Sequence, residues 1–535
     1  MAHTPRRWGY AAMGAVLATA VLSGCSGGNA GEQSDGNRTN AGNGGDPGGQ
    51  GKAEETRYIE VWRNLDSTFA IEKDGPYSKM VQADTGVGLY MPFVAWNSGS
   101  AYVQKLNTRI ASGELPDLFM PWQGNEAALM KQGALADLTE LLPEYAPHVW
   151  DRIPQEVWDV VRSADPSGEG RIYYVPLVQT YTYYGAYIRQ DWLDNVGMEL
   201  PRTKDEYVEV LRAFRDQDAN GNGDPSDEIP VTGREQGRWM DHLFGMYGVA
   251  MWEGLPMWDL YDGELTYSAI TPNMKAALEF AQMLYRERLL DPNTFLNKGS
   301  EWTAKIYNDK VGSWYHINQG MNVRIENIAK VNPDVNLVAL GLPEVDGYDG
   351  FITNTQINRP MWVIADKDEQ TTIDALSLLE WSADPAHAEQ VQLGVEGMHY
   401  EVQDGKRILL PSDPDRQETR MLASFITGMD EVQLQAQFQR DSSTPEQLRV
   451  FEMRDAIVAE MQPYGKTVAG DGIPSSIYDG YSDLKNHTMY QEYMSKIIIG
   501  EWPIDKFDEF VDKWTKSGGE EVTARARAWY NLIGR

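Results

Sequence analysis

The chain has 535 residues, of which 42% are hydrophobic and 24% are charged, and it contains one cysteine. This length and apolar share allow more than one buried core, and a single cysteine excludes a disulfide-stabilised scaffold. The 47 Lys and Arg residues against 79 Asp and Glu residues give a formal net charge of -32, which disfavours contact with nucleic-acid phosphates and anionic lipid headgroups. We therefore expect no nucleic-acid partner. The 17 Trp and 27 Tyr residues are more than a core of this size needs, so we expect some of them to face a ligand.

Residues 1–25 have the features of a bacterial export signal. Two arginines precede an apolar stretch, residues 10–22, which is too short to span a bilayer. The sequence LSGC at residues 22–25 resembles a lipobox, in which a cysteine after small residues receives a lipid and the chain is cleaved just before it. The pattern predicts a lipoprotein signal peptide over residues 1–24 and a palmitate-type lipid anchor on Cys25. The alternative is an ordinary signal peptide with an incidental cysteine.

Residues 25–56 form a predicted flexible tether that begins at the lipidated cysteine. Between positions 26 and 55 there is no aromatic or large aliphatic side chain, so burial cannot offset the entropy cost of ordering this segment. A Gly-rich coil of about 30 residues spans roughly 30 Å, enough to hold a folded body just off a membrane. No later segment has 18 consecutive apolar residues. We therefore expect an exported body that is anchored to the outer face of the cytoplasmic membrane and does not span it.

The body of the chain alternates predicted strands and helices. In chain order, the pattern predicts strands over 58–62 and 87–94, a helix over 101–112, a strand over 118–120, a helix from Thr271, a strand over 361–365 and a helix over 372–381. Thr271 is a typical helix N-cap, and Pro272 suits the first helical position. Such alternation is typical of α/β layers with parallel sheets. Because the chain is long, we expect two lobes.

Five passages of the body resemble one protein family; they are residues 104–122, 131–147, 187–230, 284–292 and 393–406. They are similar to the extracellular solute-binding proteins of family 1, and within them to the large lipoprotein branch that includes the LplA-type and alginate-oligosaccharide-binding proteins. The resemblance implies an α/β, two-lobed periplasmic-binding-protein-like fold with a hinge and an inter-lobe cleft. It also implies a non-catalytic, monomeric lipoprotein that captures an oligosaccharide and delivers it to the permease of an ABC importer. The implied lobe boundaries are residues 57–178 with 352–420 for lobe one and residues 179–351 with 421–535 for lobe two.

A loop that follows the helix predicted from Thr203 has the composition of a calcium site. Over residues 216–228 an oxygen-bearing side chain recurs about every second residue, with glycine at a tight turn, which suits the oxygen coordination of Ca²⁺. Counting from Asp216 gives an EF-hand spacing, with Gly221 at the sixth position and Asp227 at the twelfth. The second register, which we favour, follows the family's pattern and predicts as ligands Asp218, Asn220, Asn222, the carbonyl of Asp224, Asp227 and Glu228, with Asp216 in reserve. A polar surface turn without metal is the alternative.

Aromatic residues that follow strand-like runs are candidates for a ligand cleft, because a ligand of parallel α/β lobes lies outside the carboxyl ends of the strands. Trp and Tyr rings suit the apolar faces of sugars, and nearby polar groups suit the hydroxyls. The predicted ligand-binding residues are Trp62, Arg63, Trp96, Trp122, Gln123, Tyr181, Tyr183, Tyr184, Trp314, Arg359 and Glu396. For any single aromatic residue core packing is an equal alternative, and Glu396 could instead order its own turn.

A secreted carbohydrate-active enzyme is the main alternative function, because two carboxylates beside an aromatic cleft suffice for glycoside hydrolysis. The chain has neither a Gly-x-Ser-x-Gly elbow nor a His-Glu-x-x-His helix, and its seven histidines are scattered. We therefore expect a protein that is not an enzyme, and a ligand sensor on the same fold stays open. The acidic composition offers no long-range attraction for uronates, although a local arginine could pair with a carboxylate, so we expect a neutral or modestly charged oligosaccharide.

Overall fold

The computed structural model describes residues 56–63, 70–94, 100–122, 125–179, 181–318, 320–355, 357–410, 426–427, 434 and 437–534. These residues belong to one unit, Thr56–Arg535. The predicted signal peptide, Cys25 and nearly all of the predicted tether lie outside them, as do Trp96 and Gln123. No helix in the described ranges is both long enough and apolar enough to cross a bilayer.

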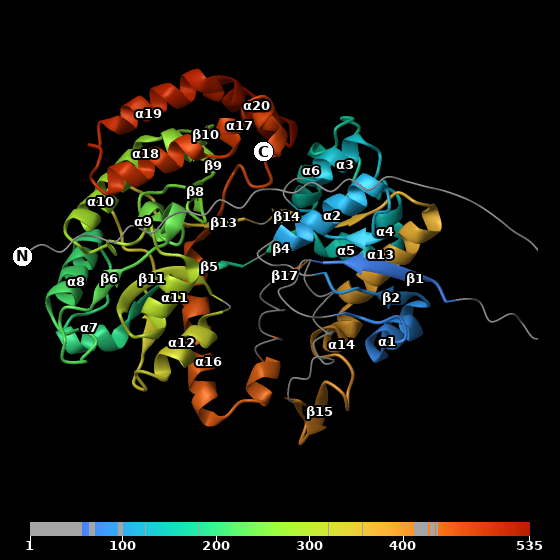
Figure 1. The fold of residues 1–535 in the computed structure, drawn as a ribbon, viewed down its shortest axis with the longest axis horizontal. Helices are drawn as coiled ribbons and strands as arrows, with labels where there is room; N and C mark the ends of the chain where they lie inside the picture. The colour runs from blue at the N-terminus through green and yellow to red at the C-terminus, as the bar shows by residue number, and fades with distance from the viewer. Residues whose placement is uncertain are drawn as a thin grey trace, which may run out of the picture. The chain divides into compact units, whose positions relative to one another are not determined.

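The first sheet has its strands in the order β17-β4-β14-β3-β1-β2. Figure 1 labels these strands with the exception of β3. The strands are β1 (Tyr58–Trp62), β2 (Gly88–Tyr90), β3 (Leu118–Phe119), β4 (Val175–Gln179), β14 (Ile357–Ile364) and β17 (Ile426–Thr427). β1 pairs in parallel with β2 and β3, and β17 pairs in parallel with β4. Only β14 runs against its described neighbours, β3 and β4. The carboxyl ends of β1, β3 and β4 therefore lie at the same edge of this sheet.

The helices of the first core begin where the local sequence favours a helix. They are α1 (Pro76–Thr85), α2 (Ser100–Ser112), α3 (Asn125–Lys131), α4 (Leu141–Tyr145), α5 (Pro147–Arg152), α6 (Gln155–Ser163), α13 (Glu369–Ala383) and α14 (Ala388–Leu393). Pro76 takes the first helical position of α1, and the Asp368 side chain accepts a hydrogen bond from the Thr371 amide at the start of α13. The apolar side chains of this core come from residues 59–178 and 361–391, together with Trp529.

The second sheet has four strands in the order β12-β5-β11-β6. They are β5 (Tyr184–Arg189), β6 (Ile229–Val231), β11 (Val311–Ile317) and β12 (Leu337–Ala339). β11 is parallel to β6 and antiparallel to β5, and nearly all of its residues are buried. A strand that is buried on both faces requires a continuous apolar or aromatic run, which the sequence VGSWYHI supplies in part.

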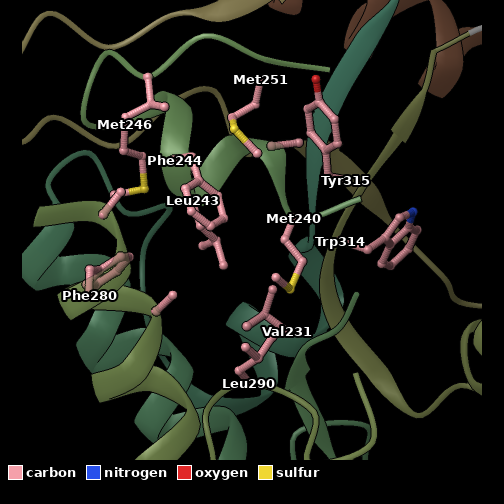
Figure 2. Packing of buried hydrophobic residues seen from close by; sticks show 14 of the residues in the cluster. Val231, Met240, Leu243, Phe244, Met246, Met251, Phe280, Leu290, Trp314 and Tyr315 are labelled. Carbon is pink, nitrogen blue, oxygen red and sulfur yellow. The ribbon is translucent and has the colours of Figure 1, made fainter. Parts of the chain in front are cut away.

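A large second core surrounds this sheet. Its helices are α7 (Gln190–Val196), α8 (Lys204–Asp216), α9 (Asp241–Gly245), α10 (Pro272–Arg286), α11 (Gly299–Tyr307), α12 (Met321–Ala329), α16 (Pro445–Met461), α17 (Ser482–Lys485), α18 (Thr488–Ile498), α19 (Lys506–Trp514) and α20 (Glu520–Leu532). Thr203 and Glu206 form the capping box of α8, and Thr271 caps α10 as expected. Figure 2 shows Trp314 and Tyr315, consecutive residues of β11, pointing to opposite sides of their strand within this core.

The segments that join the two cores are hydrogen-bonded to one another. The Thr182 amide, just after β4, donates to Oε1 of Gln462 at 2.9 Å, and the Tyr183 amide donates to Oδ1 of Asn354 at 3.3 Å. A short parallel pair, β13 (Ile352–Asn354) with β18 (Gly465–Thr467), adds backbone bonds. A Cβ at Gly465 would lie 2.1 Å from the Thr182 hydroxyl oxygen, so this close approach requires glycine.

The remaining described strands form hairpins: β7 (Met251–Trp252) with β8 (Leu255–Pro256), β9 (Trp258–Tyr261) with β10 (Glu264–Tyr267), and β15 (Tyr400–Gln403) with β16 (Lys406–Leu409). The predicted elements are present with shifted ends: the expected strand over 87–94 is only β2, and the expected helix over 372–381 extends at both ends as α13. The predicted lobe boundaries differ from the core packing at Trp529, whose indole packs in the first core and donates to Oγ of Ser163 at 2.9 Å.

Candidate functional site

The second sheet gathers functional side chains at one edge. The carboxyl ends of β6 and β11 lie at the same edge because the two strands are parallel, and antiparallel β5 begins there, with Tyr184 opposite Ile317 and Gly185 opposite His316. In α/β sheets this is the edge at which ligands bind. The residues that flank it come from the crossing before β5, from the segments after β6 and β11, and from the β7–β8 hairpin.

An aromatic group lies at the start of β5. Tyr183 and Trp252 are half-buried, and their rings are nearly parallel, with an interplanar angle of 21° and centroids 6.3 Å apart. Tyr184 meets Trp252 edge-on at 5.0 Å and stacks on Tyr315 at 5.2 Å, and Tyr181 meets Tyr183 edge-on at 6.0 Å. The three predicted tyrosines are therefore brought together, and the partly exposed faces of the Tyr183–Trp252 pair offer apolar surface to a ligand.

Two acidic residues lie beside this aromatic group. The Tyr184 hydroxyl donates to Oε1 of Glu253 at 2.6 Å, and the Gly254 amide donates to Oδ1 of Asp241 at 2.7 Å. Burial raises the pKa of Asp241 to about 7, and the second oxygen of this carboxyl has no hydrogen-bond partner among the described residues. Burial alone lowers the pKa of the neighbouring His242 to about 3, so its ring, stacked on Tyr315, is neutral.

A second group combines aromatic rings with guanidinium groups, and we call it the Arg324 cluster: Arg234, Trp239, Trp302, His316 and Arg324. The ring centroids of Trp239 and His316 are 4.4 Å apart, and Trp302 stacks on His316 at 5.3 Å. The guanidinium carbon of Arg324 lies 5.2 Å from the Trp302 ring centroid, and its Nη2 lies 3.1 Å from Nε2 of His316. The guanidinium of Arg234 lies 4.6 Å from the Trp239 ring. None of these five residues was predicted from the sequence.

The backbone around Trp239 is strained. Trp239 has φ 61° and Gln236 has φ 64°, in the left-handed region that bulky residues avoid. The segment packs closely on the β7–β8 turn, since a Cβ at Gly254 would lie 2.8 Å from the Arg238 amide nitrogen. Glu253, beside that glycine, also has a positive φ of 49°. Strain that is concentrated in two segments at one sheet edge is typical of a functional site.

The corresponding edge of the first sheet carries the predicted Trp62, Arg63 and Trp122. Trp62 ends β1 and is 6% exposed; its Nε1 donates to Oε1 of Glu60 at 2.8 Å, and the guanidinium of Arg109 lies 5.1 Å from its ring. Arg63 and Trp122 are half-buried; Arg63 directly follows β1, and Trp122 is the third residue after the end of β3. The parallel strands place all three at the same edge, as the sequence predicts.

The remaining predicted ligand residues are more dispersed. Trp314 is fully buried against Tyr187 in the second core, with ring centroids 6.0 Å apart. Glu396 is exposed in a turn before β15. Arg359 lies in β14, outside the part of the chain whose side chains are described, and Trp96 and Gln123 lie outside the described residues altogether.

The predicted calcium loop folds around its own polar side chains. Gly221 and Gly223 have φ 73° and 90°, values that favour glycine at these turns. Oδ2 of Asp218 accepts from the Gly223 amide at 2.9 Å. Oδ1 of Asp227 accepts from the side-chain amides of Asn220 and Asn222 at 3.1 and 3.2 Å. The loop thus turns the side chains of three predicted ligands, Asn220, Asn222 and Asp227, towards one another.

Three carboxylate oxygens of this loop are buried and have no hydrogen-bond partner among the described residues: Oδ1 of Asp218 and both oxygens of Glu228. Burial is the main cause of the raised pKa of Glu228, and the charges of Asp227 and Asp218 add to it. Lys310 is a nearby cation, 3.1 Å from Oδ2 of Asp227. Within the described ranges no group of three or more His, Cys, Asp or Glu side chains is close enough to hold a metal, so the acids of this loop would have to move closer to one another to bind a cation.

The alternative register of this loop begins at Asp216. Both carboxylate oxygens of Asp216 accept from the guanidinium of Arg215, at 2.6 and 2.7 Å, and the Asp216 side chain is largely exposed. This pairing lowers the pKa of Asp216. Asp216 therefore already has a cationic partner, whereas Asp218 and Glu228 retain oxygens without one.

Comparison with known proteins identifies the family. The sequence model of the bacterial extracellular solute-binding proteins matches residues 93–389. The lipoprotein LipO of Bacillus subtilis (strain 168) is 24% identical over 488 residues, which cover 87% of this chain and 90% of LipO. The fructooligosaccharide ABC transporter substrate-binding protein FusA of Streptococcus pneumoniae is 27% identical over 257 residues, 44% of this chain and 45% of FusA.

Solved structures share the fold at low sequence identity. The alginate-binding protein AlgQ2, in a crystal structure without calcium ion, has a TM-score of 0.63 at 20% identity over 89% of this chain and 98% of its own. An EF-hand mutant of FusA in complex with fructo-nystose has a TM-score of 0.65 at 18% identity, over 90% of this chain and 99% of the FusA chain. These likenesses confirm the expected two-lobed α/β fold of periplasmic binding proteins. The chain belongs to the bacterial extracellular solute-binding proteins.

Proposed function

We propose that this protein captures an oligosaccharide for an ABC importer, with the sugar held in a cleft between its two lobes. The observation that carries the proposal is the half-buried, nearly parallel pair of Tyr183 and Trp252 at the ligand-binding edge of the second sheet. Such rings bury the apolar face of a sugar ring and leave its hydroxyls to polar neighbours. FusA, which is named for fructooligosaccharides, supports this ligand class.

The proposed sugar contacts come from both sheets and from the crossing between them. Trp62 ends a strand of the first sheet, Arg63 and Trp122 come after strands of the same sheet, and Tyr183 lies in the crossing. Tyr181 and Tyr184 are 2% and 3% exposed, so their proposed role is to support the rings of Tyr183 and Trp252. Trp96, Gln123, Arg359 and Glu396 stay predictions from the sequence, as do the lobe boundaries at residues 178, 351 and 420. We propose the same two lobes with the exception of Trp529, which packs in the first core.

The proposed protein binds its sugar without chemical turnover and acts as a monomer with a membrane permease as its partner. Membership in the solute-binding family supports this function over that of a carbohydrate-active enzyme. In this class of protein two lobes close about the ligand, and the closed form differs from the open form in its interaction with the permease.

The test is calorimetric titration with a panel of oligosaccharides, together with mass spectrometry of each mixture. We expect saturable binding of at least one sugar, which mass spectrometry recovers unchanged. Trp252→Ala should weaken the affinity about ten-fold or more, because the stacking surface is lost. Trp502→Ala is the matched control, since Trp502 is also half-buried but packs on Tyr493, among the helices of the second core. Hydrolysed sugar would establish an enzyme, and equal weakening by both variants would remove Trp252 from the site.

We also propose a structural Ca²⁺ in the loop of residues 218–228. The buried oxygens of Asp218 and Glu228 that lack partners fit a hard cation, because a carboxylate that is shielded from water needs a positive counterpart. The proposed ligands are Asp218, Asn220, Asn222, the Asp224 carbonyl, Asp227 and Glu228. The two charges of the ion, together with Lys310 beside Asp227, would balance the three acids Asp218, Asp227 and Glu228. One structure of FusA is that of an EF-hand mutant, and one of AlgQ2 is that of the protein without calcium ion, which supports a cation-binding loop in proteins of this fold.

Export and lipid anchoring through Cys25 complete the proposal. The LSGC sequence at residues 22–25 supports them, and LipO, which matches along most of this chain, is named a lipoprotein. The proposed location is the outer face of the cytoplasmic membrane, with a palmitate-type anchor and the Gly-rich tether. Cys25→Ala should release the protein from the membrane fraction of expressing cells.

A further inference from the structure

The Arg324 cluster contains a guanidinium that has no carboxylate partner. Among the residues that the structure describes, Arg324 forms no ion pair, and its polar contact is with the ring nitrogen Nε2 of His316 at 3.1 Å. Arg324 is half-buried, and its Nε is shielded from solvent without a hydrogen-bond partner. In a chain with 79 acidic residues, a largely desolvated cation that none of the described acids neutralises requires an explanation, because burying an unpaired charge is costly.

The groups around Arg324 do not supply the missing negative charge. His316 is 6% exposed, and the pKa of its ring is lowered well below the ordinary value by burial and by the charges of Arg324 and Arg234, so the ring is neutral. Glu235 directly follows Arg234 in the chain, but its carboxylate already pairs with the Arg234 guanidinium and lies 3.6 Å from Nζ of Lys298. Desolvation also lowers the pKa of Arg324. The cluster thus carries a local excess of positive charge.

The surroundings of Arg324 hold its guanidinium in a fixed place. One face lies over the Trp302 ring, which is fully buried, and the His316 ring stacks on the same indole. His316 is near the carboxyl end of β11, and Arg324 is in the first turn of α12, which follows that strand. Three N–H donors of the cluster, Nε of Arg234, Nε of Arg324 and Nε1 of Trp302, have no acceptor among the described residues. Oε2 of Glu235, 3.6 Å from Nζ of Lys298, is also buried without a hydrogen bond, so donors without a partner outnumber such acceptors here.

We propose that Arg324 binds the carboxylate of an acidic sugar residue, so that the ligand of this protein is an oligosaccharide that contains a uronic acid. A planar carboxylate accepts two parallel hydrogen bonds from a guanidinium, which a neutral hydroxyl cannot do. Trp302 lies beside this cation, and half-buried Trp239 packs on Trp302 with ring centroids 4.4 Å apart, so the Trp239 ring can contact the sugar that carries the carboxylate. This inference rests on the proposed function and corrects the expectation of a neutral ligand, because the local charge of the cluster differs from that of the whole chain.

The test compares ligands that differ only in charge. The probes are trigalacturonate, triglucuronate and trimannuronate, the methyl ester of each, a neutral trisaccharide and a sulfated trisaccharide, all titrated into the full chain by calorimetry. We expect at least one free acid to bind about ten-fold to a hundred-fold more tightly than its methyl ester, and this preference to shrink as the salt concentration rises. Equal affinity for each acid and its ester, or binding of neutral sugars alone, would overturn the inference while leaving the proposed function intact.

Variants assign the preference to Arg324. Arg324→Gln should lose the discrimination between acid and ester, and Arg324→Lys should restore part of the preference because it restores the charge. Arg286→Gln is the matched control, since exposed Arg286 at the end of α10 also lacks an ion pair among the described residues. If Arg324→Gln does not fold, Arg324→Lys decides the question, because a preference for the acid as strong as that of the unaltered protein would overturn the role of the guanidinium.

The remaining outcomes separate the two proposals. Preference for the sulfated trisaccharide over every uronide would assign the anion to a sulfate ester and overturn the carboxylate. Preference for a uronide that Arg324→Gln retains would overturn the role of Arg324. Failure of every sugar to bind would overturn the proposed function itself, and the inference with it.

Discussion

The calcium loop and the Arg324 cluster are opposite cases of the same physical situation. In the loop, three buried carboxylate oxygens of Asp218 and Glu228 lack donors; in the cluster, buried N–H groups of Arg234, Arg324 and Trp302 lack acceptors. Buried polar groups in folded proteins are normally paired. The comparison teaches that the sign of the unpaired group indicates the chemistry of its partner: a cation for the loop and an anion for the cluster.

Removal of divalent metal is the strongest way to break this comparison. A ligand at 1,000 times its dissociation constant stabilises the folded state by about 4 kcal/mol. We therefore expect excess EDTA to lower the midpoint of thermal unfolding by several degrees, and Ca²⁺ to restore it. Asp218→Asn should remove this response, whereas Asp216→Asn, which alters a carboxylate already paired with Arg215, should keep it. A midpoint that EDTA leaves unchanged would contradict the site.

Asp241 tests whether a buried acid without a full set of partners always requires a ligand. Its pKa is about 7 in the folded protein and 3.8 as a free side chain, so the folded state keeps the proton that the unfolded state loses. The stability that this proton contributes is complete below about pH 4 and is lost as the pH rises through 7. The expected loss between about pH 5 and about pH 8 is about 3 kcal/mol.

The measurement for Asp241 is the free energy of unfolding of the unaltered protein and of Asp241→Asn at both pH values. The difference between the two proteins isolates this one group, because the other titrations cancel. We expect the variant to gain stability relative to the unaltered protein as the pH rises. A difference that is independent of pH would show that the Asp241 carboxyl ionises normally.

Glu228 sharpens the comparison, because its substitution should have opposite effects in the two metal states. Glu228→Gln removes a ligand, so it should destabilise the protein in Ca²⁺. In EDTA the same change removes a charge that burial and the acids Asp218 and Asp227 disfavour, so it should stabilise the protein by about 1 kcal/mol. Thermal unfolding of both proteins in each buffer measures both signs. Destabilisation of equal size in the two buffers would indicate a purely structural role for Glu228.

Removal of the unpaired charge of Arg324 should also stabilise the ligand-free protein, as for Glu228, but by a smaller free energy. Arg324→Met removes a half-buried cation and keeps an apolar side chain over Trp302, so we expect the ligand-free protein to gain up to about 1 kcal/mol, offset in part by the lost cation–π contact. Denaturant unfolding at low salt measures this change. A decrease of more than about 1 kcal/mol in the free energy of unfolding would indicate that the guanidinium stabilises the fold and is not an unpaired charge kept for ligand binding.

Local signals in the sequence predicted the elements whose cause is local. The Thr203–Glu206 capping box, the Thr271 cap and the glycine-containing loop from 216 to 228 all occur where the pattern places them. Each of these predictions depends on residues that are neighbours in the chain, so a single segment carries enough information. The placement of Trp62 and Trp122 at one edge follows from the general rule for parallel strands and requires the pairing of β1 with β3.

The rest of the candidate site depends on contacts between distant segments. Trp314 was predicted as a ligand contact, yet it lies deeper in β11 than His316 and packs on Tyr187; its depth is set by the pairing of β11 with β5. Trp252 joins Tyr183 through a hairpin nearly 70 residues away in the sequence, and Arg324 meets Trp302 from a different helix. The hydrophobic periodicity of a single segment cannot reveal such contacts between distant residues.

The most direct test of the central claim is calorimetric titration of the full chain with the oligosaccharide panel, in Ca²⁺ buffer, with mass spectrometry of every mixture. We expect saturable binding of an oligosaccharide that is recovered intact, with affinity that falls when Trp252 is replaced by alanine. Cleavage of the sugar, or no binding by any member of the panel, would contradict a solute-binding protein for oligosaccharides.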